Sequence, residues 1–284
     1  MLRNIKKVHK AAYHPIADLI TYSPLPSREL PQIDPFLFLN HHGHQVYPAH
    51  NHGLPFGPHP HRGMETVTFI IEGDIMHQDS QGYESVIRAG GVQWMTAGSG
   101  LIHAEVSSEA FKHEGGELEI LQLWLNLPAR LKMTAPGYRG LQKEDIPTIA
   151  LGEGVSLQLI AGDWQGQKGA FEPLTEVFMS VLHLEKGTSW QSQVAAERNI
   201  FLYVVRGQVA VNGQSVAFRN LIEFDNIGET LQIEAEEKSL LLFGHALPYK
   251  EPVVAQGPFV MNSLEEIHQA YEDYRRGKFG VWKG

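Results

Sequence analysis

The chain contains no cysteine among its 284 residues. This absence excludes disulfide frameworks, thiolate metal sites and cysteine nucleophiles, and it leaves histidine as the residue for any soft-metal chemistry. Basic side chains are also scarce, because 23 lysines and arginines face 32 aspartates and glutamates, which gives a net charge of −9. A nucleic-acid partner needs a basic face, so we expect no direct contact with DNA or RNA.

Long apolar runs are missing as well. Nowhere do about 20 apolar residues follow one another, and the N-terminus lacks the apolar region of a signal peptide. We therefore expect a cytoplasmic protein with no membrane partner. The chain also has no glycine-rich phosphate loop before a helix and no Gly-x-Ser-x-Gly elbow, so nucleotide and acyl-serine chemistry lack support.

Short apolar runs are present in number, and the 28 glycines and 16 prolines separate them. Their length and their β-branched and aromatic content predict an all-β fold. The strand candidates are "ETVTFII", "LEILQLWLNL", "VSLQLIA", "VFMSVLHL", "NIFLYVV", "QVAV", "LQIEA" and "SLLLFG". One short C-terminal helix is predicted from Ser263, with a capping box to Glu266, an apolar face of Leu264, Ile267, Tyr271 and Tyr274, and an end near Gly277.

An internal sequence similarity, or echo, suggests that the chain holds two related β-domains. Residues 65–77 and 199–211 are both apolar strands that run into a glycine at the same place, Gly73 and Gly207, an offset of 134 residues. Chance similarity between two hairpins is the alternative. We place the division at residues 1–142 and 143–284, with the helix in the second domain.

Two pairs of polar residues carry the chemistry. In His59-Pro60-His61 and His103-Ala104-Glu105 one residue separates the partners, so on extended backbone both side chains of a pair point to the same face. Facing strands of a small barrel would bring the two pairs together as a site for a first-row divalent metal such as iron, manganese, nickel, cobalt or copper. Glu65 has the same strand parity as His59 and His61, so either Glu65 or Glu105 is possible as the carboxylate ligand.

The residues also match a known pattern. The spacing of Gly53, His59, His61, Glu65 and Gly73 resembles the first cupin motif, and "QWMTAGSGLIHAE" resembles the second. More narrowly, the segments "DPFLFLNHHG", "PHPHRGMETVTFIIEG", "GGVQWMTAGSGLIHAE", "LQLWLNLP" and "GPFVMN" resemble the pirin family in their order along the chain. The resemblance implies two tandem cupin domains, each a double-stranded β-helix or jelly roll, of which the second is degenerate.

The resemblance also implies the metal ligands, which in pirins are the histidines of H-P-H and the His and Glu of H-A-E. Carried over residue by residue, they are His59, His61, His103 and Glu105, with Glu65 outside the ligand set. The implied ion is Fe(II), with Mn, Co, Ni, Cu or Zn as alternatives. The same offset of 134 gives Gln193, Ala195 and Asn199 in the second half, which predicts that it binds no metal.

Three functions are compatible with these residues. The first is a quercetin 2,3-dioxygenase, implied by the resemblance, which would cleave a flavonol with O2 and release CO, with Glu105 as catalytic base. The second is a metal- or redox-sensing regulator that acts through a protein partner. The third is a purely structural ion, which the carboxylate-containing ligand set disfavours because structural sites are usually closed by Cys and His. We expect a monomer.

The remaining histidines and aromatic residues receive simpler interpretations. The tract "NHHGHQVYPAHNHG" is predicted to be a loop of solvated side chains, from which His42 could line the mouth of the pocket. His77 and His245 have no partner at ligand spacing and are taken as structural or surface residues. Trp94 and Trp124 are taken as core, although Phe69 and Trp94 could form part of an apolar pocket wall.

Overall fold

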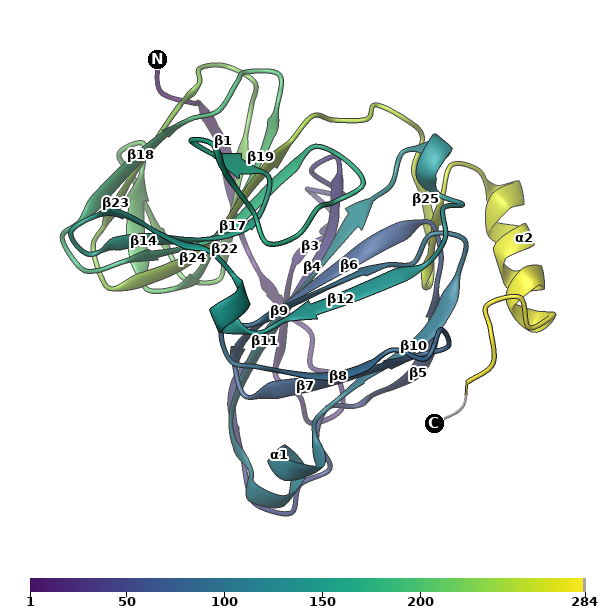
Figure 1. Ribbon diagram of the computed structural model, residues 1–284. Helices are drawn as coiled ribbons and strands as arrows, with labels where there is room; N and C mark the ends of the chain where they lie inside the picture. The colour runs from purple at the N-terminus through teal and green to yellow at the C-terminus, as the bar shows by residue number, and fades with distance from the viewer. Residues whose placement is uncertain (283–284) are drawn as a thin grey trace. The chain divides into compact units, whose positions relative to one another are not determined.

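The computed structural model describes residues 1–282 and divides the chain into two compact units, both built almost entirely of strands (Figure 1). The first unit comprises residues 13–22, 37–144 and the chain from 249 onward, and the second comprises residues 1–12, 23–36 and 145–248. The predicted all-β class is confirmed. No helix in the described part of the chain is long and apolar enough to cross a membrane.

The sheets of the first half of the chain have seven and four strands, in the orders β12-β9-β6-β11-β4-β3-β2 and β5-β10-β7-β8. The strands are β2 (Ala12–Tyr13), β3 (Thr21–Leu25), β4 (Phe36–Tyr47), β5 (Phe56–His61), β6 (Met64–Glu72), β7 (Asp74–Asp79), β8 (Glu84–Arg88), β9 (Val92–Thr96), β10 (Leu101–Val106), β11 (Gly116–Asn126) and β12 (Gly137–Leu141). One short helix, α1 (Glu109–Glu114), and two 3-10 turns, Ala129–Leu131 and Lys143–Asp145, interrupt them.

The sheets of the second unit repeat this arrangement, in the orders β1-β22-β19-β24-β17-β14-β13 and β18-β23-β20-β21. The strands are β1 (Ile5–Lys10), β13 (Thr148–Gly152), β14 (Val155–Ala161), β17 (Val177–Leu184), β18 (Ser189–Gln193), β19 (Asn199–Arg206), β20 (Gln208–Val211), β21 (Gln214–Ala217), β22 (Asn220–Phe224), β23 (Thr230–Ala235) and β24 (Ser239–Ala246), with β15 (Asp163–Trp164) and β16 (Gln167–Lys168) as a small hairpin. The echo between residues 65–77 and 199–211 therefore reflects a repeated fold, since β6 and β19 hold the same place in their sheets.

The predicted C-terminal helix is confirmed as α2 (Leu264–Arg275), which follows the hairpin β25 (Val254–Gln256) and β26 (Phe259–Met261) (Figure 1). The Ser263 side chain accepts from the Glu266 backbone, and the Glu266 side chain accepts from Ser263, so the capping box is present. The predicted apolar face is only partly correct. Ile267 and Ala270 are buried, whereas Leu264 and Tyr274 are exposed.

The compact units differ from the predicted division between residues 142 and 143 at both ends of the chain. Strand β1 pairs with β22 and packs Ile5 and Val8 against the apolar core of the second unit. At the other end, Phe259, Ile267 and Phe279 form a cluster that belongs to the first unit. Non-local strand pairing and packing thus determine the units, and order along the chain does not.

The histidine tract, residues 40–53, was predicted to be a loop. For its first half this prediction is wrong. Residues 40–47 belong to the long strand β4, where His41 and His42 are buried. His41 Nε2 lies 2.9 Å from Glu119 Oε1, and His42 Nδ1 lies 2.9 Å from Thr21 Oγ1. Buried strand positions are usually apolar. His41 and His42 can occupy them because each has a polar partner.

Candidate metal centre

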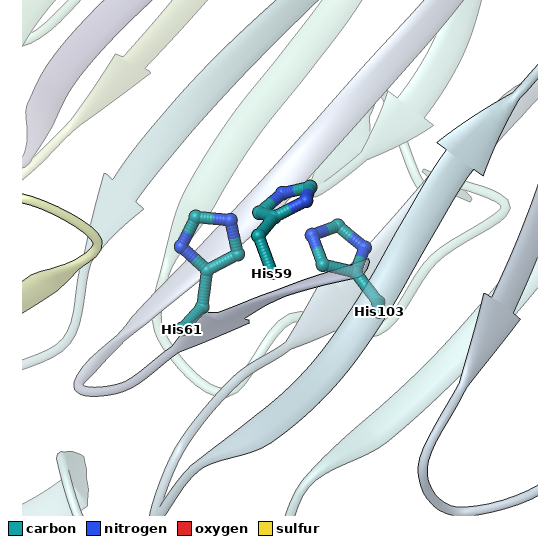
Figure 2. Close-up of side chains that lie close together, drawn as sticks. All are labelled: His59, His61 and His103. Atoms are coloured by element: carbon teal, nitrogen blue, oxygen red, sulfur yellow. The ribbon is translucent and has the colours of Figure 1, made fainter. Parts of the chain in front are cut away.

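Two neighbouring strands bring three of the four predicted ligands together. Strands β5 and β10 pair antiparallel, with His103 opposite His59 and Leu101 opposite His61. The ring centroids lie 4.9 Å apart for His59 and His61, 4.4 Å for His59 and His103, and 5.0 Å for His61 and His103. One ring nitrogen from each residue lies within 4.8 Å of the others, and Figure 2 shows the three rings gathered around a common point. We call these residues the histidine cluster.

Backbone carbonyls orient two of these rings. His59 Nδ1 lies 2.7 Å from the Gly57 oxygen, and His61 Nδ1 lies 3.1 Å from the Pro258 oxygen. A carbonyl only accepts, so Nδ1 carries a proton in both rings, and Nε2 is the nitrogen that can bind a metal ion. Such a carbonyl partner on the outer nitrogen is the usual way in which proteins orient metal-binding histidines.

Unpartnered nitrogen atoms show that the cluster suits a metal ion. His61 Nε2 and both ring nitrogens of His103 are buried and have no hydrogen-bond partner among the described residues. Buried polar atoms without partners are costly, and three converging imidazole nitrogens are a donor set that first-row divalent metals prefer. The chemistry of the donors therefore fits such an ion, although ligation itself stays a prediction.

Burial also keeps two rings of the cluster, His61 and His103, in the form that binds metal. Desolvation, with a smaller contribution from His59, lowers the pKa of His61 to about 3. Desolvation likewise lowers the pKa of His103 well below its usual range, with His61 and His59 adding to the effect. Both rings are thus neutral near pH 7, and a metal ion would not have to displace protons from them.

The fourth predicted ligand, Glu105, lies two residues after His103 on the same strand but outside the group of mutually close ligand atoms. Its carboxylate is buried and held by donors from three strands. Thr68 Oγ1 donates to Oε1 over 3.0 Å, Gln93 Nε2 donates to the same oxygen, and Gln122 Nε2 donates to Oε2. These contacts set the direction of the carboxylate beside the cluster. Ligation by Glu105 stays a prediction.

Glu65 has a different environment, and the argument from strand parity is wrong. The chain changes from β5 in the four-stranded sheet to β6 in the seven-stranded sheet between His61 and Met64, so parity does not carry across. Thr68 is the β6 residue that reaches Glu105, whereas Glu65 accepts a hydrogen bond from Thr96 Oγ1 over 2.7 Å. Burial raises the pKa of Glu65.

His77, which we took as structural or surface, is fully buried beside the cluster. Its ring lies 5.5 Å from that of His103 and stacks on Tyr138 at 3.7 Å, while Nε2 lies 3.0 Å from Asp79 Oδ2. In the register of β7 and β10, His77 stands opposite Glu105. The sequence does show His77 and Asp79 with one residue between them, a spacing that lets the side chains meet on a strand. It does not show that this strand, β7, lies next to the site.

The aromatic wall of the site also differs from the prediction. Trp124 lies 5.2 Å from the His61 ring and stacks on Phe38 at 4.5 Å. Gln93 points toward Glu105, so its neighbour Trp94 faces the other side of β9, since side chains alternate along a strand. Trp124 and Phe38 therefore offer the apolar surface next to the histidines, and Trp94 does not.

Comparisons with known proteins agree with the fold. The family model Pirin matches residues 19–125, and the family model Pirin C-terminal cupin domain matches residues 179–280. The chain is 37% identical over 255 residues to a pirin-like protein of Caulobacter vibrioides, covering 88% of this chain and 89% of the relative. It is 36% identical over 257 residues to Pirin-1 of Arabidopsis thaliana, covering 87% and 84%.

Among solved structures, a crystal structure of quercetin 2,3-dioxygenase from Acinetobacter baumannii superposes with a TM-score of 0.92. The two sequences are 35% identical, and the match covers 99% of each chain. The two β-units are thus cupin domains in tandem, as their repeated sheet order indicates.

Proposed function

Because this chain belongs to the pirin family, we propose that it is a metal-dependent dioxygenase that opens the ring of a flavonol such as quercetin with O2 and releases CO. The observation that supports the proposal most directly is the histidine cluster, three converging imidazoles beside the buried carboxyl group of Glu105. The likeness to the quercetin 2,3-dioxygenase of Acinetobacter baumannii supports the substrate class.

In this proposal His59, His61 and His103 hold a divalent first-row ion, which we take to be Fe(II), with Glu105 as the fourth ligand. The ion would supply Lewis acidity and one-electron redox chemistry next to the substrate. With at most four protein ligands, room remains for small molecules at an ion that prefers six.

The protein's own residues then have distinct tasks. Glu105 would take the proton of the flavonol hydroxyl, since a carboxylate in reach of a phenolic proton can act as a general base. Thr68, Gln93 and Gln122 fix its direction through their hydrogen bonds. Trp124 offers a flat apolar surface for the planar rings of the substrate and excludes water from one side of the site.

The test is turnover of quercetin by protein loaded in turn with Fe, Mn, Co, Ni, Cu and Zn. We expect loss of the flavonol absorbance, with oxygen uptake and CO release, for at least one metal. His59→Ala should abolish it, whereas His268→Ala, on the exposed side of α2, should not. If the protein binds metal but turns over no quercetin with any of the six metals, the result would contradict the proposed activity and favour a regulatory role.

A further inference from the structure

The second unit contains a cavity of about 680 Å3, and every residue that lines it belongs to that unit. Its walls include the apolar side chains Phe171, Val177 and Phe178, and the segment from Gln193 to Ala195 forms part of its edge. This volume is in the range of small-molecule pockets. None of these residues takes part in the histidine cluster.

The cavity lies at the place in the second fold that the histidine cluster takes in the first. Strands β5 and β10 hold the same positions in their sheet as β18 and β23. His103 stands opposite His59 in the first unit, and Thr230 stands opposite Gln193 in the second. Gln193 Nε2 donates to Thr230 Oγ1 over 3.0 Å, so an amide and a hydroxyl satisfy each other where the first unit has imidazoles.

A guanidinium group lines this cavity, and one of its nitrogens is unused. Arg198 Nε donates to His245 Nδ1 over 2.8 Å, and Nη2 donates to the backbone oxygen of Glu176 over 2.8 Å. Nη1 makes no hydrogen bond to any described residue. These contacts hold the plane of the guanidinium and leave an edge that can meet an anion.

His245 supplies a second donor. Because Nδ1 accepts from Arg198, the proton of the neutral ring sits on Nε2, which has no hydrogen-bond partner among the described residues. Burial and the neighbouring Arg198 lower the pKa of His245 to about 3, so the ring is neutral near pH 7. The ring also stacks on Phe178, with centroids 4.8 Å apart and planes 7° apart, which makes a flat wall.

The first unit has an aromatic pair at the matching place, where Phe38 stacks on Trp124 beside His61. The second unit thus keeps a stacked pair of rings at this place and has Arg198 beside it, with Gln193 and Thr230 at the positions of the metal ligands His59 and His103. The other charged groups at the cavity are Lys168 paired with Asp163 over 3.2 Å, and Glu172 and Glu176, which are exposed to water and salt that screen them.

We propose that this cavity is a second binding site, which takes a small planar carboxylate without any metal ion. Arg198 Nη1 and His245 Nε2 would donate to the carboxylate, and the planar part of the ligand would lie against Phe178. A duplicated fold would then carry two different sites, one for a metal and one for an organic acid.

Titration calorimetry of the full-length, metal-loaded protein with benzoate tests the proposal, and benzamide serves as a neutral ligand of the same shape. We expect benzoate to bind at least about tenfold more tightly than benzamide, because a charge-assisted hydrogen bond to guanidinium requires the carboxylate. Binding should persist after the metal is removed with a chelator, which distinguishes this site from the histidine cluster.

Two variants address the cavity directly. Arg198→Gln should weaken benzoate binding about tenfold or more, and Lys238→Gln, an equal loss of charge on an exposed side chain outside the cavity, should leave it unchanged. Ala195→Trp places a bulky ring on an exposed lining position, so it should block binding even if Arg198→Gln fails to fold. Equal affinity for benzoate and benzamide, no measurable benzoate binding, binding that is lost with the metal, or binding that survives Ala195→Trp would each overturn the proposal.

Discussion

At the scale of single residues, two buried glutamates near the site differ in their partners. Glu105 is oriented by three side-chain donors next to the histidine cluster, whereas Glu65 is turned toward Thr96. The sequence pattern alone allowed either residue as the ligand, because it did not show that the chain changes sheets between His61 and Glu65. The resemblance to pirins chose Glu105, and ligation by Glu105 stays a prediction.

Exchange of each glutamate for its neutral amide tests this assignment. Glu105→Gln should lower flavonol turnover about a hundredfold or more, because the proposed general base is lost. It should also weaken metal binding. Glu65→Gln should keep the metal content of the unchanged protein. Metal analysis and steady-state rates on both variants check the prediction, and full metal loss in Glu65→Gln alone would reverse the assignment.

A second residue-scale test concerns His245, whose folded-state pKa of about 3 lies below the ordinary value of 6.5. Between these two values the unfolded chain binds a proton that the folded chain does not, so stability should fall as the pH drops through this window. The slope attributable to His245 should be at most about 1.4 kcal/mol per pH unit.

Urea unfolding at pH 7, 5.5 and 4.5 measures this slope. His245→Gln should make the loss of stability with acid shallower, and exposed His268→Gln should leave it unchanged. An identical pH dependence for the His245 variant and the unchanged protein would show that the buried ring does not contribute.

At the scale of elements, local sequence pattern predicted where most strands and the C-terminal helix lie. Which of their residues are buried depends on packing between distant segments. The apolar runs quoted from the sequence lie within strands except for Leu127, one residue beyond β11, and the capping box marks the start of α2. The histidines of β4 were missed because buried partners such as Glu119 lie far away in sequence. The buried face of α2 was assigned only in part, because Ala270 is small and gave a weak signal while Tyr274 gave a strong one.

The turn between β5 and β6 follows directly on His61 and packs against β26. Gly63 has a φ of +82°, and an added Cβ would lie 2.0 Å from the backbone oxygen of Val260 on β26. The buried ammonium of Lys132 joins the same two segments, since it donates to the oxygens of Gly63 at 2.9 Å and Val260 at 3.0 Å. Close packing of these segments holds His61 against the carbonyl of Pro258.

Gly63→Ala should therefore destabilise the protein by about 3 kcal/mol or more and weaken metal binding, because positive φ and a backbone clash act together. Gly82→Ala is the matched control, since φ is +93° there but an added Cβ meets nothing within 4 Å. It should cost only about 1–2 kcal/mol and leave metal binding unchanged. Chemical denaturation and metal titration measure both effects, and equal losses in the two variants would contradict the proposed role of the turn.

At the scale of the whole molecule, one fold occurs twice with different chemistry. The sheet orders match strand for strand, yet His59 and His103 have Gln193 and Thr230 as their counterparts. The offset of 134 residues predicted Gln193 in place of His59 from sequence, whereas Thr230 in place of His103 follows only from the strand register. The N-terminal strand belongs to the second unit and the C-terminal segment to the first. This assignment could not be predicted from sequence, because it depends on pairs such as β1 with β22 that are more than 200 residues apart.

The central claim is that His59, His61 and His103 form one metal site, since they are the only group of three mutually close ligand side chains in residues 1–282. The most direct measurement is the metal content per chain of protein purified without added metal, for the unchanged protein, for the variant with all three histidines replaced by alanine, and for His268→Ala. We expect about one equivalent of a first-row metal in the unchanged protein, almost none in the triple variant, and no change in the His268 control. A full equivalent of metal retained by a folded triple variant would contradict it.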